Sequence, residues 1–200
     1  MTTRLPPRFY DRDALDVARD LVGVHLHYGP VTLRVTEVEA YRWPHDTANH
    51  CHRGPTERNA AMWGPPGRAY MYLCYGIHHM LNLVTGPSGD GAAVLIRAAE
   101  PVRGLSLIRE RRGGREGPML LNGPGKLTAA LGLDLGFDQH PVTEPGGLEV
   151  TRGTPPQALA FGPRVGIDYA EPPHVLAPWR VADANSRWVS HRRRLNRSEP

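Results

Sequence analysis

The chain has 200 residues, which is enough for one domain to bury a core without disulfide cross-links. Its 24 basic and 20 acidic side chains give a formal charge of +4, a balance that favours an anionic partner such as nucleic acid. No apolar run is long enough to span a membrane, and the first residues lack the apolar stretch of a signal peptide. Cys51 and Cys74 are too few for a disulfide framework, so we expect a cytoplasmic protein with free thiols.

The first predicted elements are a helix and a two-stranded hairpin. Apolar residues spaced three and four apart predict the helix over residues 11–23. Two apolar runs, residues 24–28 and 31–41, flank a Gly-Pro turn and predict the hairpin. His25 and His27 share a parity in its first strand, and we expect both to face solvent.

The second strand of this hairpin carries two carboxylates. Its alternation places Glu37, Glu39 and Tyr41 on one face, in a row begun by Leu33 and Val35. A carboxylate beside apolar side chains is costly unless it has partners, and such a cost is often tolerated where the carboxylate does chemistry. The alternative is that the strand leaves the core here and both glutamates are solvated, since buried glutamate is rare.

A long segment without periodicity follows, over residues 42–67. Such a segment inside one domain is either functional or disordered. Its histidines, together with Trp43 and Trp63, argue against disorder. Because it directly follows the carboxylate strand, we expect it to wall a site around Glu39.

Residues 68–84 predict a strand, a tight turn near Tyr75 and a second strand. Tyr70 and Tyr72 share one face, where tyrosines usually form a half-buried sheet surface. Tyr75 is expected at the exposed tip. Asn82 lies in an apolar run and needs partners, so it is either a structural hydrogen bonder or a reader of a polar ligand.

The next predicted element is a central strand over residues 92–101, in which Arg97 ends the apolar run. A buried arginine usually holds a carboxylate, and Glu39 is a candidate partner. A short helix over residues 102–112 should follow, with Leu105 turned inward.

A glycine-rich turn at residues 122–127 opens another helix and contains Lys126, the only lysine of the chain. Such a turn can hold a phosphate on its backbone N–H groups, although it can also be a plain helix start. It lacks the spacing of a Walker loop. The remaining expected elements are strands at 148–150, 178–181 and 188–190, followed by a flexible basic end at 191–200.

Several short motifs occur together and in order along almost the whole chain. They are Glu37-Val38-Glu39-Ala40-Tyr41, His50, the stretch from Tyr70 to Asn82, Gly89-Asp90-Gly91, Val94-Leu95-Ile96-Arg97-Ala98, Gly123-Pro124-Gly125-Lys126-Leu127 and Arg164-Val165-Gly166. With these motifs the chain resembles the alkyladenine type of 3-methyladenine DNA glycosylase, a family of base-excision repair enzymes. The resemblance implies one α+β domain over residues 1–200, with a curved, mostly antiparallel sheet, flanking helices and a protruding hairpin that intercalates into DNA.

The resemblance also implies the chemistry. Glu39 aligns with the general base that activates a water against C1′ of a flipped nucleotide. Arg97 and the backbone carbonyl of Val165 align with the groups that hold this water. Asn82 aligns with the residue that crowds the exocyclic amino group of normal guanine.

The remaining aligned residues contact the base or the DNA. Those that sandwich the flipped base are Tyr41, His50 and Tyr72. Tyr75 aligns with the intercalating wedge. Those in regions that line the DNA are Thr56, Arg58, Met62, Lys126 and Arg164.

The resemblance therefore predicts a monomeric enzyme that acts on double-stranded DNA with alkylated or deaminated purines, without cofactor or metal. We expect a monofunctional glycosylase, because cutting the strand as well would need an amine for a Schiff base and Lys126 lies far from Glu39 along the chain. The α-amino group of the chain stays open as another such amine. Two alternatives stay open. One is a metal-dependent hydrolase that uses the histidines and cysteines, although they show no recognised zinc spacing. The other is a non-catalytic damaged-DNA-binding module in which the tyrosines stack on bases.

Overall fold

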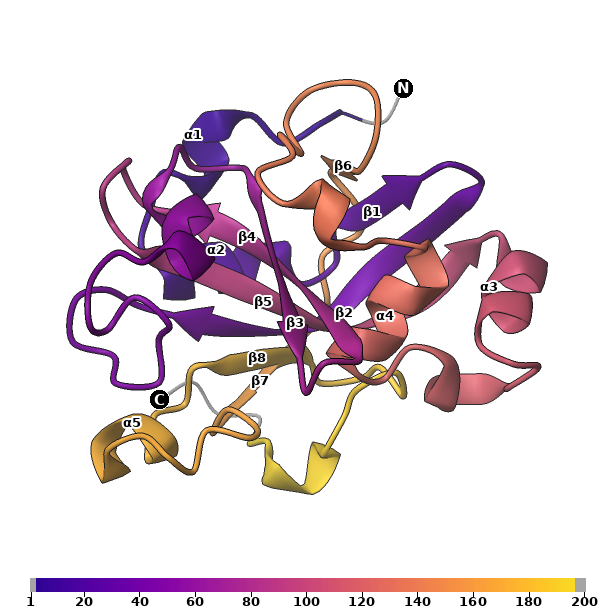
Figure 1. The fold of residues 1–200 in the computed structure, drawn as a ribbon. Coiled ribbons are helices and arrows are strands. Elements are labelled where there is room, and N and C mark those ends of the chain that lie inside the picture. Colours follow the sequence, from indigo (N-terminus) through magenta and orange to yellow (C-terminus); the bar gives the residue numbers. More distant parts are fainter. Residues whose placement is uncertain (1–2, 197–200) are drawn as a thin grey trace.

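One antiparallel β-sheet carries the described part of the chain, residues 3–196 of the computed structural model (Figure 1). Six strands run in the order β3-β4-β5-β2-β1-β6, while β8 pairs with β2 and β7 pairs with β8. The strands are β1 (His25–Tyr28), β2 (Val31–Tyr41), β3 (Ala69–Cys74), β4 (His78–Thr85), β5 (Ala92–Arg103), β6 (Glu149–Thr151), β7 (Leu159–Gly162) and β8 (Arg180–Asp183).

Short helices lie around the sheet. The α-helices are α1 (Pro7–Tyr10), α2 (Ala14–Leu21), α3 (Leu105–Arg111), α4 (Pro124–Leu131) and α5 (Pro172–Leu176). Four 3-10 helices join them: η1 (Glu57–Trp63), η2 (Gly117–Leu120), η3 (Leu135–Phe137) and η4 (Arg192–Arg194). The predicted fold class, α+β with a mostly antiparallel sheet and flanking helices, is confirmed.

Helix α2 covers part of this sheet and shows why the local sequence is helical. The Asp13 carboxylate caps it by accepting a 2.8 Å hydrogen bond from the N–H of Leu15. Val17 and Leu21 are fully buried, and burying side chains of this size contributes about 1.5–3 kcal/mol each. The helix packs on β2 and β5, the two central strands, while α4 packs on β4 and β5.

Strand β2 organises the sheet, because it pairs with three other strands. It pairs with β5 over residues 32–41, with β1 over residues 31–34 and with β8 over residues 37–39. Its neighbour therefore changes from β1 to β8 along one edge, and β8 begins to pair at Glu37. This change brings the C-terminal part of the chain beside the two glutamates.

An irregularity at Glu37 changes which face of β2 points to the core. The register with β5 shifts on both sides of this residue. Before it, odd-numbered residues such as Val35 belong to the main apolar core, and after it even-numbered residues such as Val38 do. A β-bulge has this effect, since it inserts one residue into the alternation. The prediction that Glu37, Glu39 and Tyr41 continue the row of Val35 is therefore wrong: they lie on the face opposite to this core.

The β1–β2 hairpin forms as predicted, but its histidines are not on a free surface. Strand β6 pairs with β1 and covers this edge. The two ring nitrogens of His27 lie 3.0 Å from Thr32 Oγ1 and 2.7 Å from Thr151 Oγ1. Burial lowers the pKa of His25 and of His27.

Three further elements differ between the prediction and the structure. Strand β5 continues to Arg103, so the helix predicted over residues 102–112 begins only at Leu105, which is 39% exposed and does not point inward. Strand β7 was not predicted. The strand expected at 188–190 is absent, because the N–H of Ser190 donates to the Glu37 carboxylate and not to another strand.

The basic end expected to be flexible makes some backbone contacts with the rest of the protein, although its side chains at 191–194 and 196 are exposed. Asn196 and Phe161 exchange two backbone hydrogen bonds of 2.8 Å. Arg180 Nη2 also donates to the carbonyl of Arg194 at 3.4 Å. The rest of that prediction, residues 197–200, lies outside the described residues. None of the helices within residues 3–196 combines the length and apolar character needed to cross a membrane.

Candidate active site

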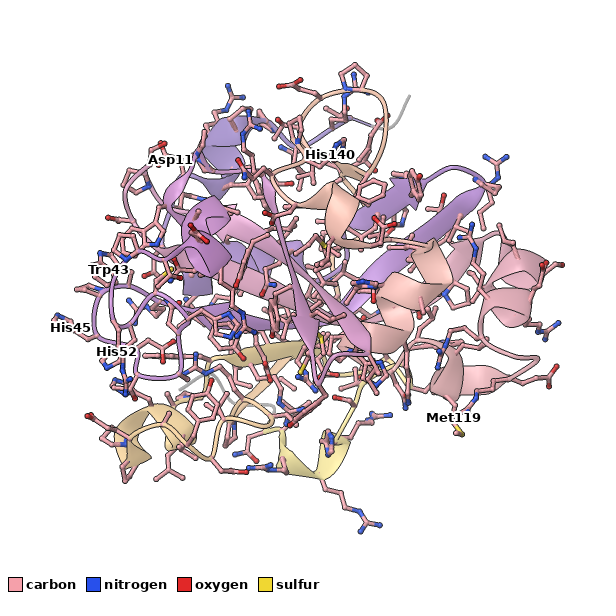
Figure 2. The ribbon with its side chains drawn as sticks, viewed as in Figure 1. Asp11, Trp43, His45, His52, Met119 and His140 are labelled. Carbon is pink, nitrogen blue, oxygen red and sulfur yellow. The ribbon has the colours of Figure 1, made fainter. Side chains whose placement is uncertain are left out.

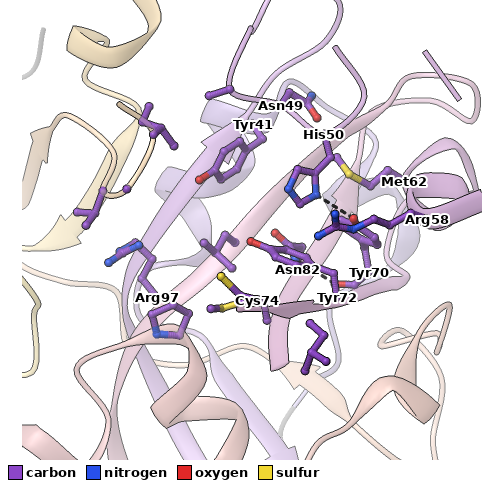
Figure 3. Close-up of a pocket in the computed structure, with 18 of the residues that line it drawn as sticks. Tyr41, Asn49, His50, Arg58, Met62, Tyr70, Tyr72, Cys74, Asn82 and Arg97 are labelled. Atoms are coloured by element: carbon purple, nitrogen blue, oxygen red, sulfur yellow. Dashed lines mark hydrogen bonds between the residues drawn. The ribbon is translucent and has the colours of Figure 1, made fainter. Parts of the chain in front are cut away.

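A cavity of about 350 Å³ lies where strands β2 to β5 meet the loops over residues 42–67 and 163–171 (Figure 3). This volume is typical of pockets for small organic ligands. The residues predicted for the site that line this cavity are Tyr41, His50, Arg58, Met62, Tyr72, Tyr75, Asn82, Arg97 and Val165. Side chains from widely separated parts of the sequence thus meet in one place.

Glu39 lies immediately behind the wall of this cavity and is fully buried. Its Oε1 accepts a 2.7 Å hydrogen bond from the backbone N–H of Val165, and its Oε2 accepts one of 3.0 Å from the Tyr41 hydroxyl. Arg97 Nη1 lies 3.3 Å from Oε1. All three partners line the cavity, so the carboxylate is held at its edge by groups that a ligand would touch.

Both glutamates of β2 are buried, so the alternative in which they are solvated is wrong. Arg97 contacts both, with its Nε 3.1 Å from Glu37 Oε1. Burial opposes the charge of this guanidinium, but Glu39 and Glu37 outweigh it and raise the pKa of Arg97 above its ordinary value. The predicted pairing of Arg97 with Glu39 is confirmed, and Glu37 is an additional partner.

Aromatic rings form the opposite wall. The Nδ1 atom of His50 lies 2.9 Å from the Tyr70 hydroxyl, an interaction drawn in Figure 3. The rings of His50 and Tyr72 meet edge to face with centroids 4.7 Å apart. Desolvation within this wall and the nearby Arg58 guanidinium lower the pKa of His50, which favours its neutral form. The wall is therefore aromatic and uncharged apart from Arg58.

Asn82 faces the cavity while making a structural hydrogen bond. It is 4% exposed, and its Nδ2 donates to the carbonyl of Tyr70 at 3.1 Å on the neighbouring strand. The structure is therefore consistent with both interpretations of this amide, as a structural hydrogen bonder and as a group that contacts a polar ligand. One hydrogen bond fixes the amide, and its position in the lining makes it available to a ligand.

Tyr75 is at the turn of the β3–β4 hairpin, as predicted, and is 89% exposed. It has φ of 52° and is followed by Gly76 with φ of 71°, and the N–H of Ile77 closes the turn on the carbonyl of Cys74. Positive φ suits glycine but is uncommon for a bulky side chain, and such strain tends to occur at functional sites.

Arg164, which the resemblance places in a region that lines DNA, has a buried side chain that is not available at the surface. Its side chain is fully buried and forms two hydrogen bonds to Asp46, one of them 2.7 Å from Nη2 to Oδ1. Its guanidinium also lies 4.6 Å from the ring centroid of Tyr41 and 4.9 Å from that of Trp179. This buried pair ties the loop after β2 to the loop that carries Val165.

Like Arg164, two other residues expected on DNA, Thr56 and Lys126, do not line the cavity. Thr56 is exposed and caps η1, where its Oγ1 accepts from the N–H of Asn59 at 3.3 Å. Lys126 Nζ donates to Asn122 Oδ1 at 2.7 Å, beside the start of α4. Two loop histidines, His45 and His52, are exposed and point away from the body of the molecule (Figure 2).

The site contains residues that the sequence patterns did not single out. Tyr169 lines the cavity, and its hydroxyl donates to the carbonyl of Ala48 at 3.0 Å. Asp46 lies in a segment without periodicity, where nothing marks one acid as buried. For Tyr70, the one sequence signal that could have indicated a place in the site is that it shares a strand face with Tyr72. Within residues 3–196 there is no group of three or more His, Cys, Asp or Glu side chains arranged as metal ligands.

An arginine-braced carboxylate behind an aromatic cavity, in a basic protein with an antiparallel sheet, is the arrangement expected of an enzyme that acts on nucleic acid. Its family follows from comparison with known proteins. The family model of the methylpurine-DNA glycosylases matches residues 8–187. The chain therefore belongs to the methylpurine-DNA glycosylase family, and it is a DNA glycosylase of base-excision repair.

Individual relatives agree with this membership. The chain is 65% identical over 195 residues to a Nitrosococcus oceani protein that carries the provisional name 3-methyladenine DNA glycosylase, with 98% of this chain and 97% of the relative covered. It is 52% identical over 188 residues to the DNA-3-methyladenine glycosylase of Arabidopsis thaliana, covering 93% of this chain and 74% of the relative. A Methanocella arvoryzae relative, also provisionally named 3-methyladenine DNA glycosylase, is 44% identical over 193 residues, covering 94% and 96%.

Proposed function

We propose that the protein flips a damaged purine out of duplex DNA and hydrolyses its N-glycosidic bond with a water activated by Glu39, leaving an abasic site. The observation that carries this proposal is the buried Glu39 carboxylate, which Arg97, Tyr41 and the Val165 N–H hold at the edge of an aromatic cavity. Alkylated and deaminated purines are the substrates that this arrangement suits best.

The chemistry needs only one carboxylate. The water oxygen forms a bond to C1′, the bond from C1′ to the base nitrogen breaks, and the base leaves with the electron pair. Glu39 accepts the proton of the water and, as an anion, stabilises the positive charge that develops on the sugar. A second acid is unnecessary when the purine is already cationic, unlike in hydrolases that cleave bonds between sugars. Arg97 and the Val165 carbonyl would orient the water.

The cavity walls would select the base. Tyr41, His50 and Tyr72 offer rings for stacking on both faces of a purine. Because the pKa of His50 is lowered, a neutral imidazole meets the base, and a cationic alkylated purine is not repelled. Asn82 would crowd the amino group of normal guanine, which excludes an undamaged base that the aromatic rings alone would accept.

The duplex would be held outside the cavity. Tyr75, exposed at the hairpin turn, would fill the gap that the flipped nucleotide leaves. Arg58 is exposed beside the cavity, and Thr56 and Lys126 would contact phosphates further out, as expected of a basic protein on DNA. Met62 lines the cavity and would contact the nucleotide itself. One copy of the chain supplies all these groups, and we propose that it acts as a monomer.

The test is base release from duplex oligonucleotides that carry hypoxanthine, ethenoadenine or 7-methylguanine. We expect release by the wild type in the presence of EDTA, and a fall of about 10²- to 10⁴-fold in the single-turnover rate of Glu39→Gln, which is typical of a lost general base. The glutamine keeps an oxygen for the Val165 N–H, so binding to the same duplex should be preserved.

The other outcomes separate the alternatives. Full activity of Glu39→Gln would refute Glu39 as the base. Tight binding of damaged duplex without release by either protein would indicate a recognition module. Base release that EDTA abolishes would indicate that a bound metal ion is needed for the chemistry.

A further inference from the structure

Glu37 is a fully buried carboxylate that does not line the cavity. It nevertheless has four hydrogen-bond donors: Arg97 Nε at 3.1 Å, Arg180 Nη1 at 3.0 Å, the Ser190 N–H at 2.6 Å and the Ser190 hydroxyl at 2.8 Å. A buried carboxylate is tolerated only with such partners. These donors come from β5, from β8 and from the segment after β8, so the network joins distant parts of the chain beside β2.

Arg97 is held by this network on the side away from the cavity. Its Nε donates to Glu37 and its Nη2 donates to the Ser190 hydroxyl at 3.4 Å, while its Nη1 lies 3.3 Å from Glu39. A guanidinium is planar and rigid, so fixing two of its nitrogens fixes the direction of the third. Glu37 and Ser190 thus determine where Arg97 Nη1 points.

The charges of the network balance only when Glu37 is ionised. Two carboxylates, Glu37 and Glu39, face two guanidiniums, Arg97 and Arg180. If Glu37 were neutral, one buried positive charge would lack a partner. Arg97 would then be drawn toward Glu39, the one remaining carboxylate in contact with it, and would leave the position set by Glu37.

We propose that Glu37 is a positioning residue for base excision: it holds Arg97 so that one guanidinium nitrogen is shared between Glu39 and the water that attacks C1′. This inference rests on the proposed function. Glu37 acts only through Arg97, which contacts Glu39 directly, and it is itself too deeply buried to touch the DNA. Its effect should therefore appear in the rate of the chemical step and not in the affinity for DNA.

The experiment compares the wild type and Glu37→Gln in single-turnover release of 7-methylguanine from a duplex, with affinity for the same duplex measured separately. Glutamine has the same shape but no charge. We expect the rate to fall about 10- to 100-fold, the size of effect produced by a misplaced catalytic group, while the dissociation constant stays within about twofold.

A double-mutant cycle with Arg97→Met tests whether Glu37 affects the rate through Arg97. If Glu37 acts through Arg97, adding Glu37→Gln to Arg97→Met should change the rate by less than about threefold, because the group to be positioned is already gone. Multiplicative losses in the double variant would overturn the proposal. So would a Glu37→Gln protein that is folded and within twofold of the wild-type rate.

Two further variants test whether a slower release of the base reflects only a loss of stability. Asp183→Asn removes another buried acid, the partner of Arg34 at 3.0 Å, without touching Arg97. It should lower the melting temperature but keep the single-turnover rate. Ser190→Ala leaves all four charges in place and removes the hydroxyl between Glu37 and Arg97, so it should slow release about 3- to 10-fold even if Glu37→Gln does not fold. An unchanged rate in Ser190→Ala would contradict the proposal.

The outcomes distinguish this inference from the proposed function. A wild type that releases no base overturns both. An active wild type whose rate depends on Glu39 but not on Glu37 or Ser190 overturns this inference alone.

Discussion

The backbone N–H of Val165 donates a 2.7 Å hydrogen bond to Oε1 of Glu39, across a separation of 126 residues. The resemblance had assigned the carbonyl of Val165 to the site, and the structure adds a function for its N–H. Hydrogen bonds to a charged group are stronger than those between neutral groups. This contact therefore couples the loop after β7 to the carboxylate.

The loop that carries Val165 depends on a buried ion pair, so Asp46→Asn should destabilise the protein strongly. The substitution leaves Arg164 charged, buried and without its anionic partner, and we expect a loss of about 3–5 kcal/mol in the free energy of unfolding, measured by urea denaturation. The matched control is Glu149→Gln, which breaks a pair with Arg4 whose side chains are 26% and 41% exposed. That change should be within about 1 kcal/mol. Equal losses in the two variants would contradict the structural importance of the Asp46 pair.

Replacing Tyr75 by glycine should preserve or raise the stability of the protein but weaken its binding to damaged duplex. Glycine relieves the positive φ at this position, which for another residue is unfavourable by about 1–2 kcal/mol. Its greater freedom in the unfolded chain offsets about 0.5–1 kcal/mol of this gain. Tyr75→Gly should therefore be as stable as the wild type or up to about 1.5 kcal/mol more stable in thermal unfolding, yet it should bind damaged duplex about 10-fold more weakly because the stacking ring is gone.

The control for Tyr75 is Ile77→Gly at the same turn. Ile77 is 71% exposed and does not line the cavity, so its removal should leave affinity for damaged duplex unchanged. A Tyr75→Gly protein with wild-type affinity would remove Tyr75 from the wedge function.

Asn82→Ser should relax the discrimination against guanine. The shorter side chain frees space in the wall and removes the 3.1 Å hydrogen bond to the Tyr70 carbonyl. We expect the release rate of undamaged guanine, relative to 7-methylguanine, to rise about 10-fold, the range in which one small group in a pocket discriminates. Unfolding should become easier by about 1 kcal/mol through the lost hydrogen bond. An unchanged ratio of rates would assign Asn82 to structure alone.

His50 should remain neutral at a lower pH than an ordinary histidine. Desolvation and Arg58 lower its pKa below 6.5 in the folded protein, so the unfolded chain binds its proton first as the pH falls. The stability that neutral His50 contributes is therefore complete above pH 6.5 and is lost between 6.5 and its folded pKa.

NMR titration of the imidazole measures this shift directly, with His50→Gln to assign the signal. The same variant should show a flatter dependence of unfolding free energy on pH just below 6.5. A His50 that titrates at or above its ordinary value would show that the aromatic wall does not desolvate it.

The local features of this protein follow from its amino-acid sequence. Alternating apolar residues and turn residues predicted the β1–β2 hairpin and the β3–β4 hairpin with Tyr75 at its turn, because both depend on neighbours a few positions apart. An arginine within an apolar strand required a carboxylate, and Arg97 does pair with Glu39. The ordered motifs identified the family, which the family comparison confirms.

The pairing of the buried acids with the arginines, in contrast, depends on the folded arrangement of distant segments. The bulge at Glu37 depends on the register with β5, and Ser190 reaches Glu37 across 153 residues. Asp46 and Arg164 each look like surface residues in the sequence, yet they bury one another. Whether a charge can be buried depends on the partner that the fold supplies, and that partner comes from a distant part of the chain, which no local pattern encodes.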